Sequence, residues 1–238
     1  MTTLGRCLLV LSKSKISTYE QCGWKYKKQY IDKIPSPPTA AMERGTNIHK
    51  VLEVIYKDPR ILKAEKEEDF LKIIEDHSEN KNITGDAVWK NHFAKFNAEL
   101  IENTGTCIPK IIEGYIKDPK MGLNGIVDRV DSCDSGWVVI DYKTGNYKKT
   151  LDDVNKLELA VYSILVMRKH GGKVAYIGIY YADKGKLVVE ECKQEYVENA
   201  LGRMEAVKIG IQQGNFSKKP SWKCRFCSYA KSMHCEYG

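Results

Sequence analysis

Hydrophobic positions divide the chain into a helical first part and a strand-rich second part. In residues 17–30, aromatic and basic side chains recur at helical spacing behind Ser17, which predicts a short basic helix capped by that serine. The prolines of residues 35–38 end it, and a second helix is expected over 47–56. Over 58–105 the pattern stays helical and strongly charged, so we interpret this segment as a helical insertion.

Beyond this segment, the apolar positions fall into short runs rich in β-branched and aromatic residues, which indicates strands. Five strands are expected, at residues 110–116, 125–130, 137–141, 174–181 and 187–191. Between the third and fourth, apolar residues recur at helical period over 151–170, and a last helix is expected over 194–212. This order predicts an α/β fold in which a mixed central sheet is flanked by helices.

The composition limits the possible domain organisation but does not by itself indicate a function. With 238 residues, 42% of them hydrophobic, the chain can bury one main core, so we expect a single domain over 1–238. The net charge of +7 would attract a polyanion weakly, but many solvated globular proteins are equally basic. There is no internal repeat and no phosphate-binding loop of an ATP motor, so any unwinding of a nucleic acid would belong to another chain.

The expected location follows from the apolar runs. Residues 7–11 are too few for the core of a signal peptide, and no later run is long enough to span a bilayer. We therefore expect a cytoplasmic protein, or one of the host-cell cytoplasm if it is viral, with no membrane partner.

Two aspartates close neighbouring strand-like runs, Asp128 and Asp141. If these runs are adjacent strands, both carboxylates emerge at the same end of the sheet and offer Mg²⁺ or Mn²⁺ the hard oxygen ligands that these ions prefer. Lys143 lies two residues beyond Asp141 and so returns to the same face, where its cation could assist the attacking water and offset charge on a phosphate. A surface hairpin with a few charged residues would be the simpler explanation of an isolated Asp-x-Lys.

The flanks of these aspartates carry a family resemblance. The run Gly-Ile-Val-Asp-Arg-Val-Asp from Gly125, followed by Val-Val-Ile-Asp-Tyr-Lys-Thr-Gly from Val138, resembles the nuclease core of the PD-(D/E)XK superfamily. The likeness is to its RecB-like branch, which includes the AddB nuclease domain and the CRISPR-associated adaptation nucleases, and it extends more loosely to most of the chain. It implies a restriction-endonuclease-like core and a metal-dependent DNA nuclease in which Asp128, Asp141 and Lys143 are catalytic.

The resemblance suggests additional metal ligands. His49 stands in the run Arg-Gly-Thr-Asn-Ile-His, which resembles the family's Gly-Thr-x-x-His element and its metal-binding histidine, whereas an isolated helical histidine is more often structural. Glu113 resembles an acidic position ahead of the Gly-x-x-Asp strand, with a solvent-facing strand glutamate as the alternative. The carbonyl of Tyr142 would complete the shell formed by His49, Asp128 and Asp141.

The helix after the lysine strand departs from the family pattern. Where relatives carry Gln-x-x-x-Tyr, this chain has Glu158 and Tyr162, whose spacing still puts them on one helical face. Tyr162 would stack on a base or orient Lys143, with ordinary packing as the alternative. Glu158 would repel a phosphate unless it pairs with Lys143 or touches the metal.

Four cysteines have a spacing that suits a metal centre. Cys224, Cys227 and Cys235 lie close together near the end of the sequence, and Cys22 is a distant fourth. Four thiolates can hold a zinc ion or an iron-sulfur cluster, and His234 could take part in a zinc site. The split arrangement resembles the 4Fe-4S cluster of RecB-family nucleases, which we favour, with zinc as the alternative.

Such a centre would join residues 17–30 to residues 213–238 as an iron-sulfur clamp that contributes to folding rather than to hydrolysis. The four remaining cysteines have no partner spacing and are interpreted as ordinary thiols: Cys7, Cys107, Cys133 and Cys192.

Basic and aromatic residues, most of them in the clamp, offer phosphate attraction and stacking planes, although a solvated face over an aromatic cluster would look the same. The predicted DNA-binding residues are Trp24, Lys25, Lys27, Lys28, Arg129, Trp222, Lys223 and Arg225.

The resemblance implies hydrolysis of DNA that is single-stranded or has free ends. It favours a 5′ to 3′ exonuclease with endonuclease activity as a second possibility, working with a helicase or with other recombination or adaptation proteins. The settings left open are DNA repair, recombination, CRISPR adaptation and viral DNA processing. Two alternatives are a catalytically inactive DNA-binding subunit and a zinc-stapled adaptor that binds protein partners through the insertion.

Overall fold

The computed structural model describes residues 9–79, 87–230 and 235–237. The helices are α1 (Lys13–Gln21), α2 (Gly23–Tyr26), the π-helical turn η1 (Lys27–Ile31), α3 (Ala40–Ile55), α4 (Glu67–Glu79), α5 (Ala87–Thr104), α6 (Asp153–His170) and α7 (Gln194–Gln212), with short helical turns η2 (Pro59–Leu62), η3 (Ala182–Lys184) and η4 (Trp222–Phe226). The strands are β1 (Ile111–Asp118), β2 (Leu123–Cys133), β3 (Gly136–Lys143), β4 (Val174–Tyr181) and β5 (Lys186–Glu191).

The five strands form one mixed sheet in the order β1-β2-β3-β4-β5. Neighbouring strands are antiparallel except β3 and β4, which are parallel. Parallel neighbours need a crossover connection, and α6 supplies it. The predicted α/β fold, with a mixed sheet flanked by helices, is confirmed.

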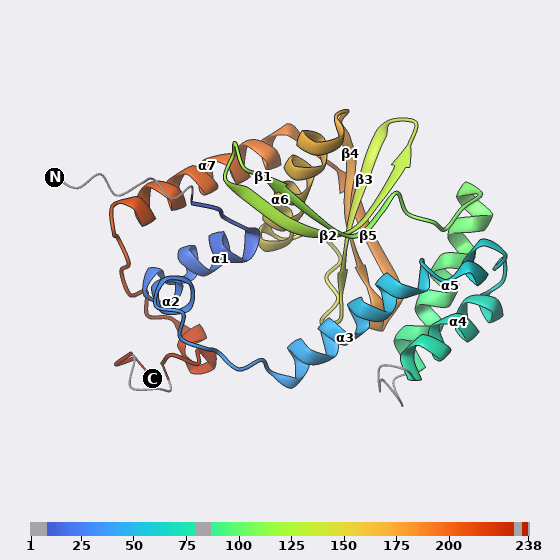
Figure 1. Ribbon diagram of the computed structural model, residues 1–238, viewed down its shortest axis with the longest axis horizontal. Helices are drawn as coiled ribbons and strands as arrows, with labels where there is room; N and C mark the ends of the chain where they lie inside the picture. Colours follow the sequence, from blue (N-terminus) through green and yellow to red (C-terminus); the bar gives the residue numbers. More distant parts are fainter. Residues whose placement is uncertain (1–8, 80–86, 231–234, 238) are drawn as a thin grey trace.

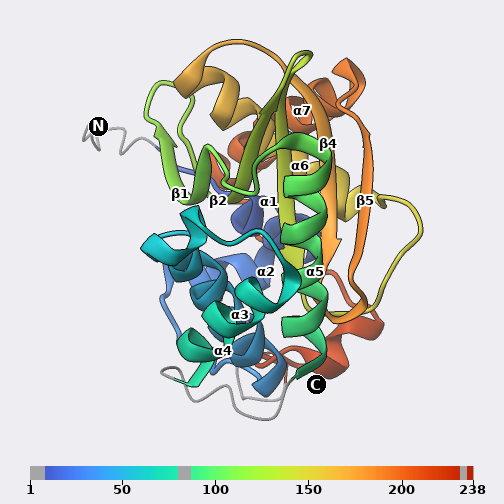
Figure 2. The ribbon, with the colours of Figure 1, turned by 90° about the vertical axis from the view of Figure 1, so that its right-hand side faces the viewer.

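Each face of the sheet carries its own hydrophobic core. On one face, α1, α6 and α7 pack on strand residues that include Val127, Val139 and Ile179. On the other face, α3, α4 and α5 cover Ile140 and Tyr142. The alternation of neighbouring residues between the two cores is the two-residue period of a strand that is buried on both sides. Figure 1 shows these layers, and Figure 2 views them with α4 and α5 in the foreground.

The predicted boundaries of the first two helices were wrong. Ser17 is not a cap, because the helix already begins at Lys13, where the Ser12 hydroxyl accepts a hydrogen bond from the backbone N–H of Lys15. It ends at Gln21, and the next residue, Cys22, has an extended backbone and accepts at its Sγ a hydrogen bond from the N–H of Lys25 in α2. The second helix starts earlier than expected because Thr39 caps it.

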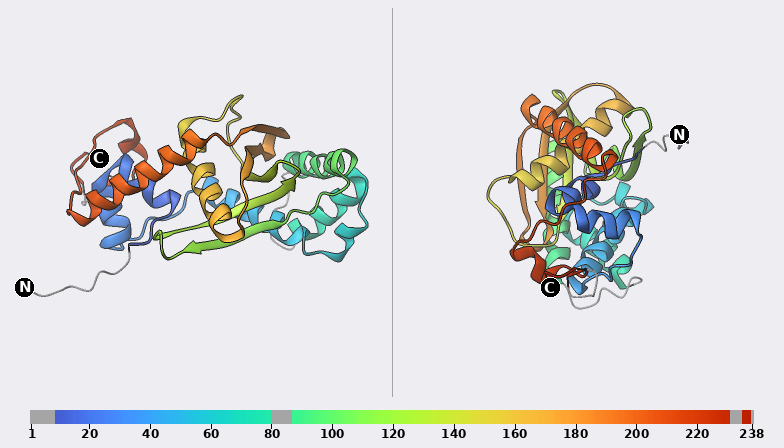
Figure 3. Two further views of the ribbon diagram at one scale, coloured as in Figure 1. Left: turned by 90° about the horizontal axis from the view of Figure 1, so that it is seen from above. Right: turned by 90° about the vertical axis from the view of Figure 1, so that its left-hand side faces the viewer.

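Segments from the two ends of the sequence pack together. Tyr19 donates a hydrogen bond to the carbonyl of Asn215, the Trp24 N–H donates to that of Ser217, and Lys219 donates to that of Glu20. This paired region lies at one end of the molecule, and the helices α4 and α5 lie at the other, as Figures 1 and 3 show. Among the helices that the structure describes, none has the length and apolar composition required to cross a bilayer.

Candidate nuclease site

The two predicted aspartates lie on neighbouring antiparallel strands, β2 and β3. Asp128 is 5% exposed and Asp141 is 2% exposed. The Asp128 carboxylate accepts a hydrogen bond of 2.8 Å from the backbone N–H of Tyr142, so strand pairing itself fixes this side chain beside β3. The Lys143 Nζ lies 2.7 Å from Oδ2 of Asp141, as expected for residues two apart on one strand face.

A histidine and a second acid complete a three-residue group at Asp128. His49, on α3, has its Nδ1 2.9 Å from Oε1 of Glu113 and 3.6 Å from Oδ2 of Asp128. One potential ligand atom from each of His49, Glu113 and Asp128 lies within 4.8 Å of the other two. The carbonyl of Tyr142, 3.1 Å from Nε2 of His49, points to the same place.

Glu113 reaches this group through an unusual backbone conformation. Its φ is 44°, in the left-handed region that residues with a Cβ rarely adopt. The β1–β2 ladder pairs Ile112 with Arg129 and Gly114 with Val127, and Glu113 falls between these pairs. Backbone strain of this kind persists where the surroundings hold it in place, and it is common at functional sites. The alternative of a solvent-facing strand glutamate therefore does not describe Glu113.

The carboxylates shift the protonation of their neighbours. Burial opposes protonation of His49, but its hydrogen bond to Glu113 and the charge of Asp128 outweigh burial and raise its pKa to about 9. Burial, followed by the charge of Asp141, raises the pKa of Asp128 well above its usual value. Burial, followed by the charge of Glu158, raises the pKa of Asp141 to about 6. A site with this much gathered negative charge favours a cation.

Glu158, the departure from the family glutamine, lies between two lysines. Its Oε2 is 2.8 Å from Nζ of Lys143 and 2.9 Å from Nζ of Lys13, the first residue of α1. Burial raises the pKa of Glu158, but the two lysines outweigh it and lower that pKa, so the side chain is a carboxylate. Lys13 was not predicted as a site residue from the sequence. The signal that could have indicated it is a positive charge at the first position of a helix, directly after the Ser12 cap.

The group opens into a pocket of about 540 Å³. Its walls include the metal-ligand candidates His49, Glu113 and Asp128 together with Lys13 and Tyr162. Tyr162 is held close to Gly125, where an added Cβ would come within 3.2 Å of the tyrosine ring. The pocket therefore joins the carboxylates to the tyrosine predicted for the site.

The four selected cysteines line a second, smaller cavity. Cys22, Cys224, Cys227 and Cys235 all lie on its wall, next to Trp24 and Tyr229. The structure thus brings Cys22 to the other three across nearly the whole chain length. Cys7 and His234 lie outside the described residues. Cys107, Cys133 and Cys192 are free thiols that do not line this cavity.

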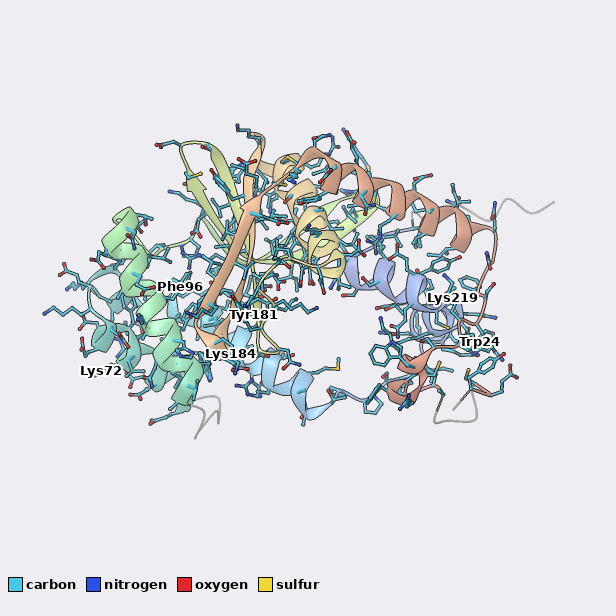
Figure 4. All side chains as sticks on the ribbon, turned by 180° about the vertical axis from the view of Figure 1, so that it is seen from behind. Trp24, Lys72, Phe96, Tyr181, Lys184 and Lys219 are labelled. Atoms are coloured by element: carbon cyan, nitrogen blue, oxygen red, sulfur yellow. The ribbon has the colours of Figure 1, made fainter. Side chains whose placement is uncertain are left out.

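The predicted DNA-binding residues differ in accessibility. Trp222 is 66% exposed, on η4 with Lys223 and Arg225. The ring of Trp24 carries the ammonium groups of Lys27 and Lys28, at 5.4 and 4.4 Å from its centroid, and Lys25 bonds to Gln21. Figure 4 shows Trp24 and Lys219 together at this end of the molecule.

Arg129 is a correction, because its side chain is not available to DNA. It is 1% exposed, and its guanidinium donates to the Asp131 carboxylate, the Tyr56 hydroxyl and the carbonyl of Cys107. Asp128, one residue earlier, is at the site, and the alternation of the strand turns Arg129 towards the opposite face, where it lies over the rings of Tyr56 and Phe96.

A mixed sheet that presents two buried aspartates, with a helical histidine beside the first and a lysine two residues after the second, is the arrangement of nuclease cores. Residues 10–232 match the sequence model of the PD-(D/E)XK nuclease superfamily, and the chain belongs to that superfamily.

Individual proteins that are similar to this chain include the following two. A subunit of an ATP-dependent helicase/deoxyribonuclease from Streptococcus uberis (strain ATCC BAA-854 / 0140J) is 27% identical over 165 residues, a match that covers 62% of this chain and 15% of that much longer protein. A crystal structure from Eubacterium rectale with a provisional exonuclease assignment has a TM-score of 0.53 at 11% identity, covering 97% of this chain and 92% of that one. At this identity the second likeness supports the fold alone.

Proposed function

We propose that the chain is a deoxyribonuclease that hydrolyses DNA phosphodiester bonds with Mg²⁺ or Mn²⁺. The observation that carries the proposal is the group His49, Glu113 and Asp128, with Asp141 and Lys143 beside it. Imidazole and carboxylate donors in a pocket of unbalanced negative charge suit a divalent cation. When bound, such an ion polarises a phosphate and its attacking water.

The residues of the chain would divide the work between holding the ion and orienting the substrate. His49, Glu113, Asp128 and Asp141 would be the side-chain ligands, and the carbonyl of Tyr142 would add an oxygen. Burial lowers the pKa of Lys143, but the charges of Asp141 and Glu158 outweigh it and raise that pKa, so this lysine would act as a cation that orients water and phosphate rather than as a proton acceptor. The ring of Tyr162, on the pocket wall, would stack on a base or steady Lys143.

Single-stranded DNA with a free end is the substrate that we propose. Exposed Trp222 and the lysines over Trp24 combine stacking planes with positive charge, which is how single strands are bound without regard to sequence. The family resemblance favours digestion from the 5′ end, with internal cleavage as a second activity. The Streptococcus uberis relative is part of a helicase/deoxyribonuclease, so we propose a helicase on another chain as a partner in repair, recombination, adaptation or viral DNA processing.

We further propose that the four clamp cysteines hold a 4Fe-4S cluster. All four cysteines line one cavity, which supports a shared centre. Four thiolates can hold a zinc ion or a 4Fe-4S cluster, and the resemblance of the split cysteine set to RecB-family nucleases favours the cluster.

The nuclease proposal is tested with a single-stranded oligonucleotide labelled at one end or the other, in Mg²⁺, Mn²⁺ or chelator. A 5′ exonuclease releases the 5′ label as short products at once and shortens the 3′-labelled strand progressively, whereas cleavage of circular single strands reports endonuclease activity. Asp141→Asn should lower the rate about 10²–10³-fold, as expected when one charged group is lost from a preorganised site. Asp134→Asn, in the exposed turn between β2 and β3, is the matched control.

Equal cleavage by wild type and Asp141→Asn would contradict the proposal. Metal-independent DNA binding without any product would favour the inactive subunit instead. For the clamp, anaerobically purified protein should be brown and contain roughly four irons and four sulfides per chain. Cys227→Ser should lose them and Cys133→Ser should keep them, whereas colourless protein with one zinc would support the adaptor-type zinc site.

A further inference from the structure

Lys13 forms an ion pair inside the candidate site although it lies 145 positions before its partner. Its Nζ is 2.9 Å from Oε2 of Glu158, the oxygen that also contacts Lys143 at 2.8 Å. The side chains of Lys13 and Glu158 are 16% and 9% exposed, so water screens this pair only partly. Lys13 also lines the pocket that contains His49, Glu113 and Asp128.

The position of Lys13 is not explained by the stability of its helix. It is the first residue of α1, directly after the Ser12 cap, and the first turn holds no acidic residue. The N-terminus of a helix carries partial positive charge, so a lysine there is disfavoured. A sequence that breaks a local rule at the wall of a functional pocket points to a role in that pocket.

The charges around the pocket show what this role would be. Four carboxylates gather there, from Glu113, Asp128, Asp141 and Glu158, and two lysines face them. One divalent cation would bring this set to neutrality with His49 as a neutral ligand. Without Lys13, the set would stay negative against an incoming phosphate, and Lys143 alone would have to satisfy Glu158.

We infer that Lys13 is a positioning residue that neutralises Glu158 and thereby leaves Lys143 directed at Asp141 and the scissile phosphate. The inference rests on the proposed nuclease function, because it names a residue that prepares that site. It also explains how Glu158 can lie beside a pocket proposed to bind DNA, because the positive charge of Lys13 offsets the negative charge that would repel a phosphate.

Three variants test the coupling: Lys13→Gln, Glu158→Gln and the double variant. Lys13→Gln should lower kcat about tenfold or more with a smaller change in KM, because Glu158 then holds Lys143 away from the phosphate. The double variant should recover most of this loss, since the charge that Lys13 balanced is gone. Lys72→Gln makes the same charge change on α4, far from α1 in Figure 4, and should leave kcat unchanged.

Two results would overturn the inference. One is a Lys13→Gln protein with wild-type kcat and KM. The other is a loss that persists undiminished in the double variant, which would mean that Lys13 contacts DNA directly or serves only the fold. Melting temperatures of all variants identify the structural case, in which loss of kcat follows loss of stability.

Calorimetry of Mn²⁺ binding separates this inference from the proposed function, because it needs no DNA. Lys13→Gln should tighten Mn²⁺ about threefold or more, Glu158→Gln should weaken it by a similar factor, and the double variant should return to near the wild-type affinity. If the wild type cleaves no DNA but this pattern holds, the proposed function fails and the charge coupling stands. If the wild type cleaves DNA and the pattern is absent, the coupling fails alone.

Discussion

Replacing Glu113 with glycine and with alanine separates the strain at this residue from its use as a ligand. Its φ of 44° costs a residue with a Cβ about 1–2 kcal/mol. Glycine avoids that cost in the folded state. It nevertheless lowers the free energy of unfolding by about 0.4–1 kcal/mol relative to alanine, because glycine gives the unfolded chain more conformational entropy. Both variants lack the carboxylate, so their difference isolates the backbone. We expect Glu113→Gly to be more stable than Glu113→Ala by about 0.5–1 kcal/mol.

Urea denaturation of the metal-free proteins at 25 °C measures this difference, which should also appear as a melting point roughly 2 °C higher for the glycine variant. Mn²⁺ affinity should fall about tenfold or more in both variants, as removal of one charged ligand from a small set predicts. The matched control is Glu191, at the exposed end of β5 and without a positive φ, where alanine should be the more stable replacement.

Equal stability of Glu113→Gly and Glu113→Ala would refute the strain argument. Unchanged Mn²⁺ affinity in both would refute the ligand assignment, whatever the stabilities. The two measurements are independent, so the backbone strain and the role of Glu113 as a metal ligand are tested separately.

Four further predictions concern other parts of the structure. Because His49 has a pKa raised to about 9 and must lose a proton to bind metal, Mn²⁺ affinity should rise between about pH 7 and 8.5, and calorimetry of His49→Asn should show no such rise. Gly125→Ala should cost about 1 kcal/mol in urea denaturation and lower kcat by displacing Tyr162, so wild-type values for both would contradict the packing argument. Arg129→Met should cost about 2 kcal/mol or more, since it removes the hydrogen bonds of a buried guanidinium to the half-buried Asp131 carboxylate and the Cys107 carbonyl, without a specific loss of DNA affinity. The reverse pattern would restore Arg129 as a DNA contact. Trp222→Ala should weaken single-stranded DNA binding in anisotropy titrations by about 1–3 kcal/mol, and unaltered affinity would remove η4 from the proposed surface.

The sequence was informative wherever the signal is local. Short runs of β-branched and aromatic residues located all five strands, because such residues pack well on a pleated surface. The flanks of Asp128 and Asp141 also identified the family, since the geometry of adjacent strand ends imposes a short motif.

Features set by distant residues could not be predicted in this way. The pair of Lys13 and Glu158 depends on α1 packing beside α6, which no local pattern encodes. Arg129 carries a charge that suggested a surface, but the face of β2 on which it lies is decided by the sheet and its second layer of helices. The left-handed backbone of Glu113 could not be predicted from the residue type, because glutamate normally avoids that conformation.

The packing of α1 against α7 has a consequence for the order in which contacts form during synthesis. Tyr19 packs against Gly210, and Glu20 forms an ion pair with Arg203, so α1 finds its final contacts on a helix that is translated far later. During vectorial synthesis, which adds about 5–20 residues per second, the sheet and α6 can form while α1 still lacks its contacts with α7. Lys13 is thus synthesised well before α7, the helix that completes the packing of α1. All residues that line the pocket precede α7 in the sequence, so the pocket walls are synthesised before the helix that completes the packing of α1 behind them.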